Sequence, residues 1–349
     1  LTSNEENDGA AGWAADGSGV FFLSSRSGSP QVWYLATAGG EAVPVTQLPL
    51  DVAGFRASPG SDRLIVAVEV FPDCSDLECT RKRLDERKAA KRNGQVFDQL
   101  FVRHWDRWKD GRISKLFSIA LDAERKPVGK PVPLTAKLDA DIPSKPLGGR
   151  ADYAFSPDGT QVVFAARVRG RTEPWSTNFD IWRVPADGSA VPVNLTADNP
   201  AWDAQPAYSA DGKWLAHLAM ERQGFEADRY RLVVRDAATG AIRFTTGDWD
   251  RSIAAFHFSA DGASVYVVAD DLGQRPLSSI DLRSGARKAL TLAGNVTEFD
   301  VAGSRLVFAM QNLSAPSDFY LIAGDAAPRR LTDVNATRLS DVKWGEAEQ

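Results

Sequence analysis

Phe155-Ser156-Pro157-Asp158-Gly159, followed by the apolar run VVFAA, decides the fold because the same phrase recurs along the chain. Close copies are YSADG at 208–212 and FSADG at 258–262, and a degenerate copy, WAADG, stands at 13–17. Asp-Gly between apolar stretches favours a tight hairpin, because glycine accepts a positive φ and aspartate can bond its own backbone. The residues after each turn are apolar at consecutive positions, which predicts strands that are buried on both faces.

The copies recur at a regular interval. Asp158 and Asp211 are 53 residues apart, and Asp211 and Asp261 are 50 apart. Each interval also holds an outer strand with a turn, such as 180–189, and a short closing strand, such as 192–196. Four strands in a unit of about 40–50 residues are typical of a propeller blade. We therefore predict an all-β fold, a β-propeller of four-stranded blades.

Six units can be counted along the chain. They lie at about 3–49, 50–137, 150–198, 199–247, 248–294 and 295–335. Two copies of the turn are worn, because Ser58-Pro59-Gly60 lacks the aspartate and Val301-Ala302-Gly303 keeps only the glycine. Leu1-Thr2 has the form of the end of a preceding closing strand, so we expect seven blades in the intact protein. We assign 1–345 to the propeller and 346–349 to the start of a linker.

The rhythm of the blades is interrupted at about 72–114. Within this insertion, 77–92 predicts a short and very polar helix, which is either a solvated excursion from a blade hairpin or an arm that docks onto a neighbouring domain. A cluster of aromatic and charged residues follows, and we expect it to pack and to form hydrogen bonds between domains. Its members are Arg103, His104, Trp105, Asp106 and Trp108.

Cys74 and Cys79 are the only cysteines of the chain, and both lie in the insertion. A pair this close in a polar loop could form a small disulfide in an oxidising compartment, or remain as two free thiols in the cytosol. We favour the disulfide. Two cysteines and the dispersed His104, His217 and His257 do not make a four-ligand zinc site, so no metal site is predicted.

Composition excludes several classes of function. Hydrophobic residues make up 43% and charged residues 25% of the chain, as in an ordinary globular protein. The net charge of −5, with both signs interspersed, argues against nucleic acid as a partner, and no apolar run approaches the ~20 residues that span a bilayer. No Gly-x-Ser-x-Gly elbow, phosphate loop or His-Glu-x-x-His occurs, so no catalytic residue and no cofactor is predicted in this segment.

Three features together resemble the propeller of prolyl oligopeptidase family serine peptidases, in the bacterial dipeptidyl aminopeptidase and acylaminoacyl-peptidase branch. They are the FSPDG blades, the stretch RHWDRW at 103–108 and the stretch MERQGFEADR at 220–229. FSPDG is shared with TolB-like propellers, whereas RHWDxW is more specific. The resemblance implies a C-terminal α/β-hydrolase domain with the catalytic Ser, Asp and His, over which the propeller admits only short peptides. That domain and short peptides are the implied partners, and a homo-oligomer is left open.

An exopeptidase must bind the free amine of a peptide, for which a carboxylate is the natural partner. Residues of both signs follow a buried inner strand, acids for the amine and arginines for a substrate carbonyl. They are Glu221, Arg222, Glu226 and Arg229. The alternative is an ordinary hairpin loop with surface ion pairs.

For the chain as a whole, the alternative function is a stand-alone TolB-like periplasmic binding propeller without catalysis. A propeller hydrolase with a metal in its channel is less favoured, because it would need acidic and amide ligands that converge from several blades, which a sequence cannot show. The cysteine pair and the resemblance together favour a periplasmic or secreted location, with the cytoplasm as the alternative.

Overall fold

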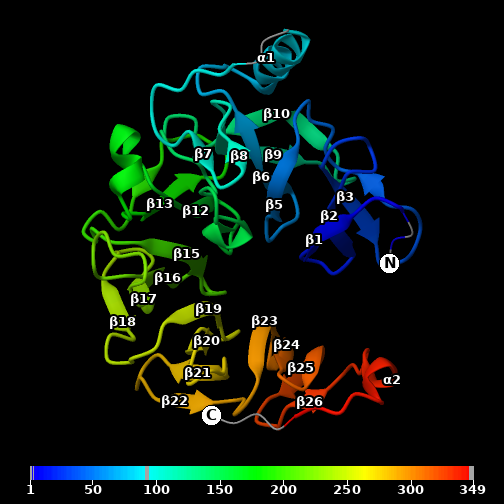
Figure 1. Ribbon diagram of the computed structural model, residues 1–349, viewed down its shortest axis with the longest axis vertical. Coiled ribbons are helices and arrows are strands. Elements are labelled where there is room, and N and C mark those ends of the chain that lie inside the picture. Colours follow the sequence, from blue (N-terminus) through cyan, green and yellow to red (C-terminus); the bar gives the residue numbers. More distant parts are fainter. Residues whose placement is uncertain (1, 3, 91–93, 346–349) are drawn as a thin grey trace. The chain divides into compact units, whose positions relative to one another are not determined.

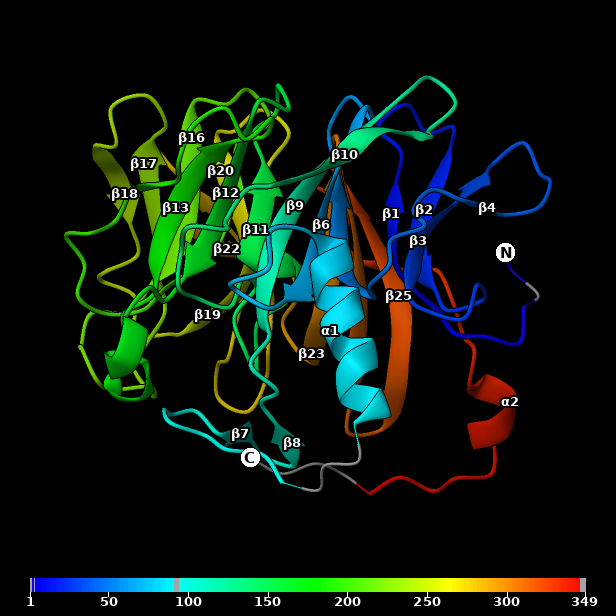
Figure 2. The ribbon, with the colours of Figure 1, turned by 90° about the horizontal axis from the view of Figure 1, so that it is seen from above.

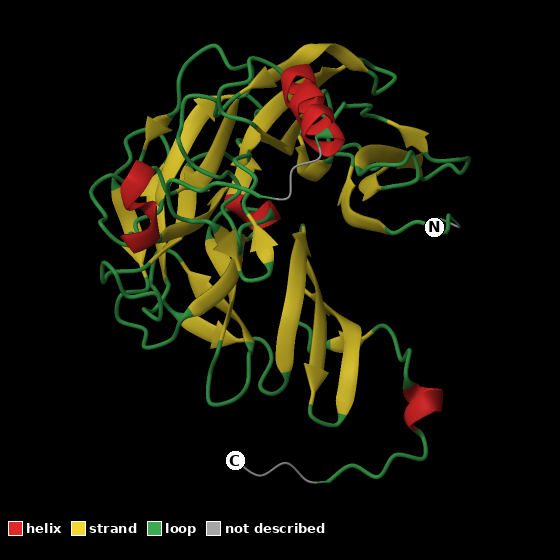
Figure 3. Ribbon diagram, turned by 45° about the horizontal axis from the view of Figure 1, so that its top comes forward, coloured by secondary structure: helices red, strands yellow, loops and turns green. Residues whose placement is uncertain are grey.

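Strands are the main regular secondary structure of the computed structural model, which describes residues 2, 4–90 and 94–345 (Figure 3). The chain divides into two compact units. The first is Leu1–Pro206 with Glu221–Glu226, and the second is Ala207–Met220 with Ala227–Gln349. Each unit is described below by its own contacts. The predicted linker at 346–349 lies outside the described residues.

Three four-stranded sheets belong to the first unit (Figure 1). In chain order their strands are β1 (Asp8–Trp13), β2 (Gly19–Ser24), β3 (Gln31–Ala36) and β4 (Val43–Pro44); β5 (Val52–Ala57), β6 (Arg63–Val70), β9 (Ile113–Leu121) and β10 (Pro127–Pro133); and β11 (Tyr153–Phe155), β12 (Gln161–Ala166), β13 (Asp180–Pro185) and β14 (Val193–Asn194). The second sheet has the order β10-β9-β6-β5, so the insertion joins its two middle strands.

Three further four-stranded sheets follow along the chain, each with its strands in sequence order. Their strands are β15 (Asp203–Tyr208), β16 (Trp214–Ala219), β17 (Arg231–Asp236) and β18 (Ile242–Thr245); β19 (Ile253–Phe258), β20 (Ser264–Ala269), β21 (Leu277–Asp281) and β22 (Arg287–Ala289); and β23 (Asn295–Ala302), β24 (Arg305–Asn312), β25 (Ala315–Ala323) and β26 (Arg329–Arg330). Six sheets of four strands agree with the six units that were counted.

The Asp-Gly phrase forms the turn between the first two strands of a sheet. Ser156 Oγ donates to Asp158 Oδ1 over 2.5 Å and accepts from the backbone N–H of Gln161 over 2.9 Å. Gly159 has a φ of +71°, a conformation that glycine adopts without steric cost. The serines at 209 and 259 make the same pair of bonds. The turn is therefore a closed hydrogen-bonded unit.

In the incomplete copy at Ser58-Pro59-Gly60, other residues take the roles of the missing ones and the turn is kept. Ser58 Oγ donates to Asp62 Oδ1 over 2.7 Å, so an aspartate further along replaces the one that the motif lacks. Ser61 takes the positive φ, at +55°, in place of the glycine. The sequence pattern is lost here while the hairpin is kept.

A threonine hydroxyl binds the third strand of every sheet. In the third sheet, Thr196 Oγ1 accepts from the backbone N–H of Ile181 over 2.9 Å, and Thr196 is only 1% exposed. The equivalent threonines of the other five sheets are Thr46, Thr135, Thr246, Thr291 and Thr332. In the first five sheets this threonine is buried at the end of the closing strand, and it satisfies a backbone donor that would otherwise be buried without a partner. In the sixth sheet the same bond is exposed.

The strands β12 and β16, which follow the turns at Asp158 and Asp211, are buried on both faces, as predicted. In β12 the residues from Val162 to Ala166 are all buried, and in β16 the side chain of His217 is 1% exposed. Strand β24 differs, because Leu306 and Phe308 are buried while Val307 between them is 38% exposed. One face of β24 therefore carries most of its burial.

The insertion contains α1 (Leu77–Ala89) and a hairpin of β7 (Arg103–His104) and β8 (Arg107–Trp108). The helix begins at Asp76, whose side chain accepts from the backbone N–H of Cys79 over 2.8 Å. Only Leu77 and Thr80 of this helix are buried, which confirms the predicted polar helix. The predicted end at 92 lies outside the described residues.

The other helical segments are short: η1 (Arg150–Asp152), η2 (Gly170–Trp175) and α2 (Ala336–Leu339). No helix in the described part of the chain has the length and apolar character needed to cross a bilayer.

Candidate functional site

The β7–β8 hairpin stands apart from the sheets of the first unit (Figure 2). At its tip Trp105 has a φ of +49°, an uncommon conformation for a bulky residue. Trp105 is 69% and Trp108 64% exposed. Arg103 holds this arrangement by donating to the carbonyl of Trp105 over 3.0 Å, with its guanidinium carbon 5.7 Å from the centre of the Trp108 ring. Asp106 is exposed in the same turn.

The base of the hairpin is packed by aromatic contacts. Trp108 stacks on Phe97 with ring centres 5.7 Å apart, and His104 contacts Phe101 at 4.9 Å. Burial, with a further contribution from the Lys109 ammonium, lowers the pKa of His104 from its ordinary value. His104 is therefore a neutral group near pH 7, suited to hydrogen bonding. These contacts link Arg103, Trp105 and Trp108 to one another, whereas His104 packs on Phe101 and Asp106 is exposed at the turn.

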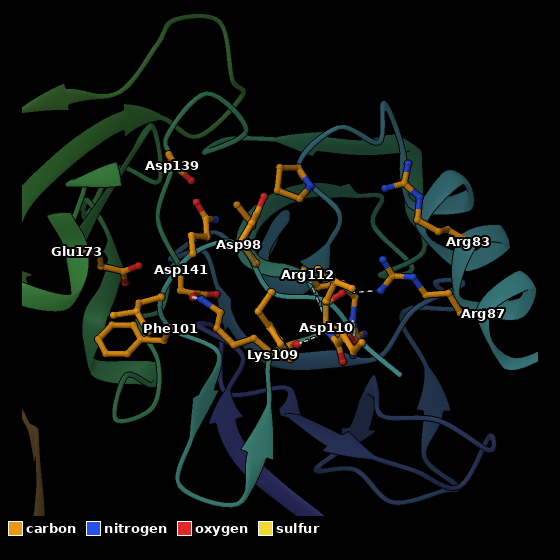
Figure 4. A pocket seen from close by; sticks show the side chains of 18 of the residues that line it. Arg83, Arg87, Asp98, Phe101, Lys109, Asp110, Arg112, Asp139, Asp141 and Glu173 are labelled. Atoms are coloured by element: carbon orange, nitrogen blue, oxygen red, sulfur yellow. Dashed lines mark hydrogen bonds and ion pairs between the residues drawn. The ribbon is translucent and has the colours of Figure 1, made fainter. Parts of the chain in front are cut away.

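A pocket of about 830 Å³ opens next to this hairpin (Figure 4). Carboxylates of Asp139, Asp141 and Glu173 lie on one side of it, and the guanidinium groups of Arg83 and Arg87 reach it from α1 on the other side. The volume is in the range of natural ligand sites. The pocket is thus lined by charges of both signs, with Glu86 also on the α1 side and Lys109 beside Asp141.

The floor of the pocket is fixed by a buried ion pair. Lys109 Nζ lies 3.3 Å from Asp141 Oδ2, while Asp141 Oδ1 accepts from the backbone N–H of Ser114 over 2.7 Å. Asp141 is only 7% exposed. A carboxylate that is satisfied on both oxygens at such depth is a structural anchor, and it ties the loop after β10 to β9.

On the side of the pocket that α1 forms, two arginines stack on one phenylalanine. The guanidinium carbons of Arg83 and Arg87 lie 4.7 and 4.3 Å from the ring centre of Phe71. Arg83 makes two bonds with the carboxylate of Asp73, of 2.7 and 2.8 Å. Arg87 donates instead to the backbone carbonyl of Asp110 over 2.5 Å. Arg83 is therefore bound to a carboxylate, whereas Arg87 is bound to a neutral backbone carbonyl.

Cys74 and Cys79 form a disulfide at the start of α1, with Cα atoms 5.5 Å apart. Both residues are half-buried. The backbone N–H of Phe71 donates to Thr80 Oγ1 over 3.2 Å, which adds a second attachment of the helix to the end of β6. The disulfide thus belongs to the part of the insertion that positions the arginine wall.

Three of the predicted amine-site residues, Glu221, Arg222 and Glu226, are exposed in a segment of the first unit. Arg222 packs on Phe225, with its guanidinium carbon 4.2 Å from the ring centre. The segment is attached by the backbone N–H of Gly224, which donates to Thr177 Oγ1 over 2.8 Å. The structure thus places both acids on one exposed segment.

Arg229 belongs to the second unit. Its guanidinium donates to the carbonyl of Gly247 over 3.1 Å and to the carbonyl of Trp249. At least two N–H groups of the Arg229 guanidinium therefore bind the loop at 247–249.

Sequence reasoning missed the pocket, because its walls come from α1, the segment 94–101, the loop at 139–141 and η2. The charges of α1 were interpreted as a solvated face, and nothing in their spacing indicates which of them point into a cavity. In the described ranges, no group of three or more His, Cys, Asp or Glu side chains is placed to hold a metal ion.

Comparisons with solved structures define the fold. The β-propeller domain of the Trilobed protease from Pyrococcus furiosus superimposes with a TM-score of 0.61 at 11% identity, over 94% of this chain and 82% of that one. The acylaminoacyl peptidase of Pyrococcus horikoshii gives a TM-score of 0.69 at 14% identity, over 96% of this chain and 46% of that one. The chain is therefore a β-propeller of four-stranded blades, as predicted.

Curated relatives then support the resemblance drawn from the motifs. Dipeptidyl-peptidase 5 of Porphyromonas gingivalis is 26% identical over 325 residues, which cover 92% of this chain and 46% of the relative. Dipeptidyl-peptidase 5 of an Aspergillus fumigatus strain is 27% identical over 308 residues, which cover 80% of this chain and 41% of the relative. No protein-family model matches. The chain thus matches peptidases of the expected kind and spans less than half the length of these relatives.

Proposed function

We propose that the chain is the substrate-gating and positioning propeller of a serine exopeptidase that hydrolyses short peptides. The observation that carries this proposal is the match of 92% of the chain to less than half of a dipeptidyl-peptidase. The catalytic serine, aspartate and histidine lie in a separate α/β-hydrolase domain, where acyl transfer passes through an acyl-serine. The names of the curated relatives favour this function over a TolB-like binding propeller.

The β7–β8 hairpin is the surface on which that domain docks. Two tryptophans that are 69% and 64% exposed are unusual on a surface that faces only water. Trp175 of η2 is exposed as well, at 74%. Large amphipathic rings of this kind form the anchors of protein interfaces. Docking there places the reaction centre over the insertion.

Glu221 and Glu226 bind the free amine of the peptide, because they are exposed carboxylates on one segment, which a hydrogen bond from Gly224 to Thr177 attaches to the first unit. Arg222 stands beside them and can bind a substrate carbonyl. The disulfide supports an oxidising compartment, and we place the protein in the periplasm or outside the cell.

The experiment is the isolation of the native gene product, followed by intact mass measurement and labelling with a fluorophosphonate that reacts with activated serine. We expect a mass well above 37.9 kDa, labelling at one serine outside the present residues, and release of dipeptides from unblocked peptides. A native product of 37.9 kDa without serine labelling would overturn the proposal and favour a binding propeller.

A further inference from the structure

The charges of the 830 Å³ pocket are not all matched inside the protein. Lys109 is paired with Asp141, at 3.3 Å, and Arg83 with Asp73, at 2.7 Å. Arg112 lies 2.8 Å from Asp110 and 3.4 Å from Glu69. Each of these cations therefore has a carboxylate partner already.

Arg87 is different. Within the described ranges it has no carboxylate at ion-pair distance, and it contacts the carbonyl of Asp110 and the ring of Phe71. A guanidinium carries five N–H donors, so several remain for a ligand. Figure 4 shows its side chain reaching from α1 toward the interior of the pocket. Stacking on Phe71 holds the group in place, which lowers the entropy lost when a ligand binds.

The opposite wall has the complementary property. Asp98 and Asp139 line the pocket, and in the described part of the chain neither carboxylate has an ion-pair partner. Glu173, on the same side, is paired with Arg167 at 3.2 Å. A guanidinium without a carboxylate at ion-pair distance and two carboxylates without a cation at that distance thus line one cavity large enough for a small ligand, and the charged group that acts on Asp139 from outside the pocket is Lys115.

We propose that this pocket is a peptide site additional to the amine site proposed at Glu221 and Glu226, and that it binds short peptides with two free ends, holding the C-terminal carboxylate at Arg87 and the terminal ammonium at Asp98 and Asp139. That the ligand is a peptide rests on the proposed function. That the ligand carries opposite charges at its two ends rests on the charges of the pocket. Arg87 binds a carboxylate in the two-bond geometry that a guanidinium favours.

The test is calorimetric titration of the present chain with trialanine, trialanine amide and N-acetyl-trialanine. We expect trialanine to bind about tenfold more tightly than its amide, since one charge-assisted contact is lost in the amide. The change Arg87→Gln should weaken trialanine about tenfold and leave the amide unaffected. Arg81→Gln, on the same helix and paired with Asp85 outside the pocket, is the matched control and should change neither affinity.

Asp139→Asn provides an independent test at the other wall. It should remove the preference for trialanine over N-acetyl-trialanine while keeping the preference over the amide. Equal binding of trialanine and its amide by the unaltered chain, no binding of either, or equal losses in Arg87→Gln and Arg81→Gln would each overturn the inference. Because no turnover is measured, these results leave the serine-labelling test of the proposed function untouched.

Discussion

The hydroxyl of Thr196 accepts a hydrogen bond of 2.9 Å from the backbone N–H of Ile181, in a position that is 1% exposed. The same bond ties the last strand to the third strand in all six sheets. Each blade thus has its own side-chain hydrogen bond next to its fourth strand. In most blades this strand is short and offers few backbone hydrogen bonds.

We expect Thr196→Val to lower the free energy of unfolding by about 1–3 kcal/mol, because valine keeps the volume and leaves the Ile181 N–H without an acceptor. Thermal unfolding followed by circular dichroism measures the loss. Thr245→Val, on the exposed strand β18, is the control and should stay within about 0.5 kcal/mol. Equal melting of the two variants would show that this hydrogen bond contributes little.

Asp152 gives a pH dependence of stability. Burial raises its pKa from 3.8 to about 6, so the folded state holds this proton more tightly than the unfolded chain. Its contribution to stability is therefore present below pH 3.8 and is lost as the pH rises toward 6. Asp152→Asn should remove this loss and be at least as stable at pH 7, since the amide oxygen can still accept from the backbone N–H of Gly149. Melting curves between pH 4 and 7 measure the difference, and a less stable variant at pH 7 contradicts the prediction.

Asp211 should behave in the opposite sense. Lys213 and then Ser209 lower the pKa of its carboxyl to about 2, so its stabilisation is present above pH 3.8 and is lost as the pH falls toward 2. Asp211→Asn should therefore weaken the chain at neutral pH and flatten the acid side of the melting profile. An unchanged acid profile in the variant would show that this turn aspartate is energetically neutral.

Removal of the disulfide should loosen α1 before it affects the sheets. Joining Cys74 to Cys79 closes a very short loop, for which chain entropy predicts about 2 kcal/mol. We expect the change of both cysteines to serine to increase proteolysis within 74–90, while the melting of the sheets moves little. The unaltered chain treated with reductant is the control and should give the same cleavage pattern. Undiminished protection of α1 would mean that Asp76 and Thr80 suffice to hold it.

Trp105→Ser together with Trp108→Ser tests the docking surface. Both side chains are largely exposed, so the melting temperature of this chain should not fall by more than about 2 °C. Association with a separately produced catalytic domain should weaken at least tenfold in a titration. Trp13→Ser, equally exposed on β1, is the control for loss of surface tryptophan. Unaltered affinity would exclude the hairpin from the interface.

Glu221→Gln and Glu226→Gln test the amine site in the protein that carries the catalytic serine. We expect at least one of them to raise KM for unblocked peptides more than tenfold and to leave N-acetylated substrates unaffected, because the lost contact is made to the ammonium. Steady-state kinetics on matched blocked and unblocked substrates measures this. Turnover of unblocked peptides that neither change affects would end the amine-site hypothesis.

Local chemistry made the blades predictable. Ser156, Asp158 and Gly159 form their turn from bonds within six residues, so the pattern can be recognised without the rest of the fold. The helix at 77–89 was predictable for the same reason, since its cap and ion pairs are local. The disulfide pairing of Cys74 and Cys79 required only their proximity in the chain.

The pocket was not predictable from the sequence, because the role of each charged side chain depends on which group it contacts in the folded chain. Arg83 and Arg87 look alike in the sequence. In the structure, however, Arg83 pairs with the carboxylate of Asp73, whereas Arg87 donates to the backbone carbonyl of Asp110. The worn turn at Ser58 shows the same limit, since only the fold reveals that Asp62 replaces the missing aspartate.

What the sequence alone determined is the repeating four-stranded blade, because turn chemistry and apolar runs act over a few residues. Which charges remain available to a ligand was decided only by the tertiary structure. Coulomb energy depends on distance and burial, and those quantities exist only once α1, β9 and the loop at 139–141 have come together.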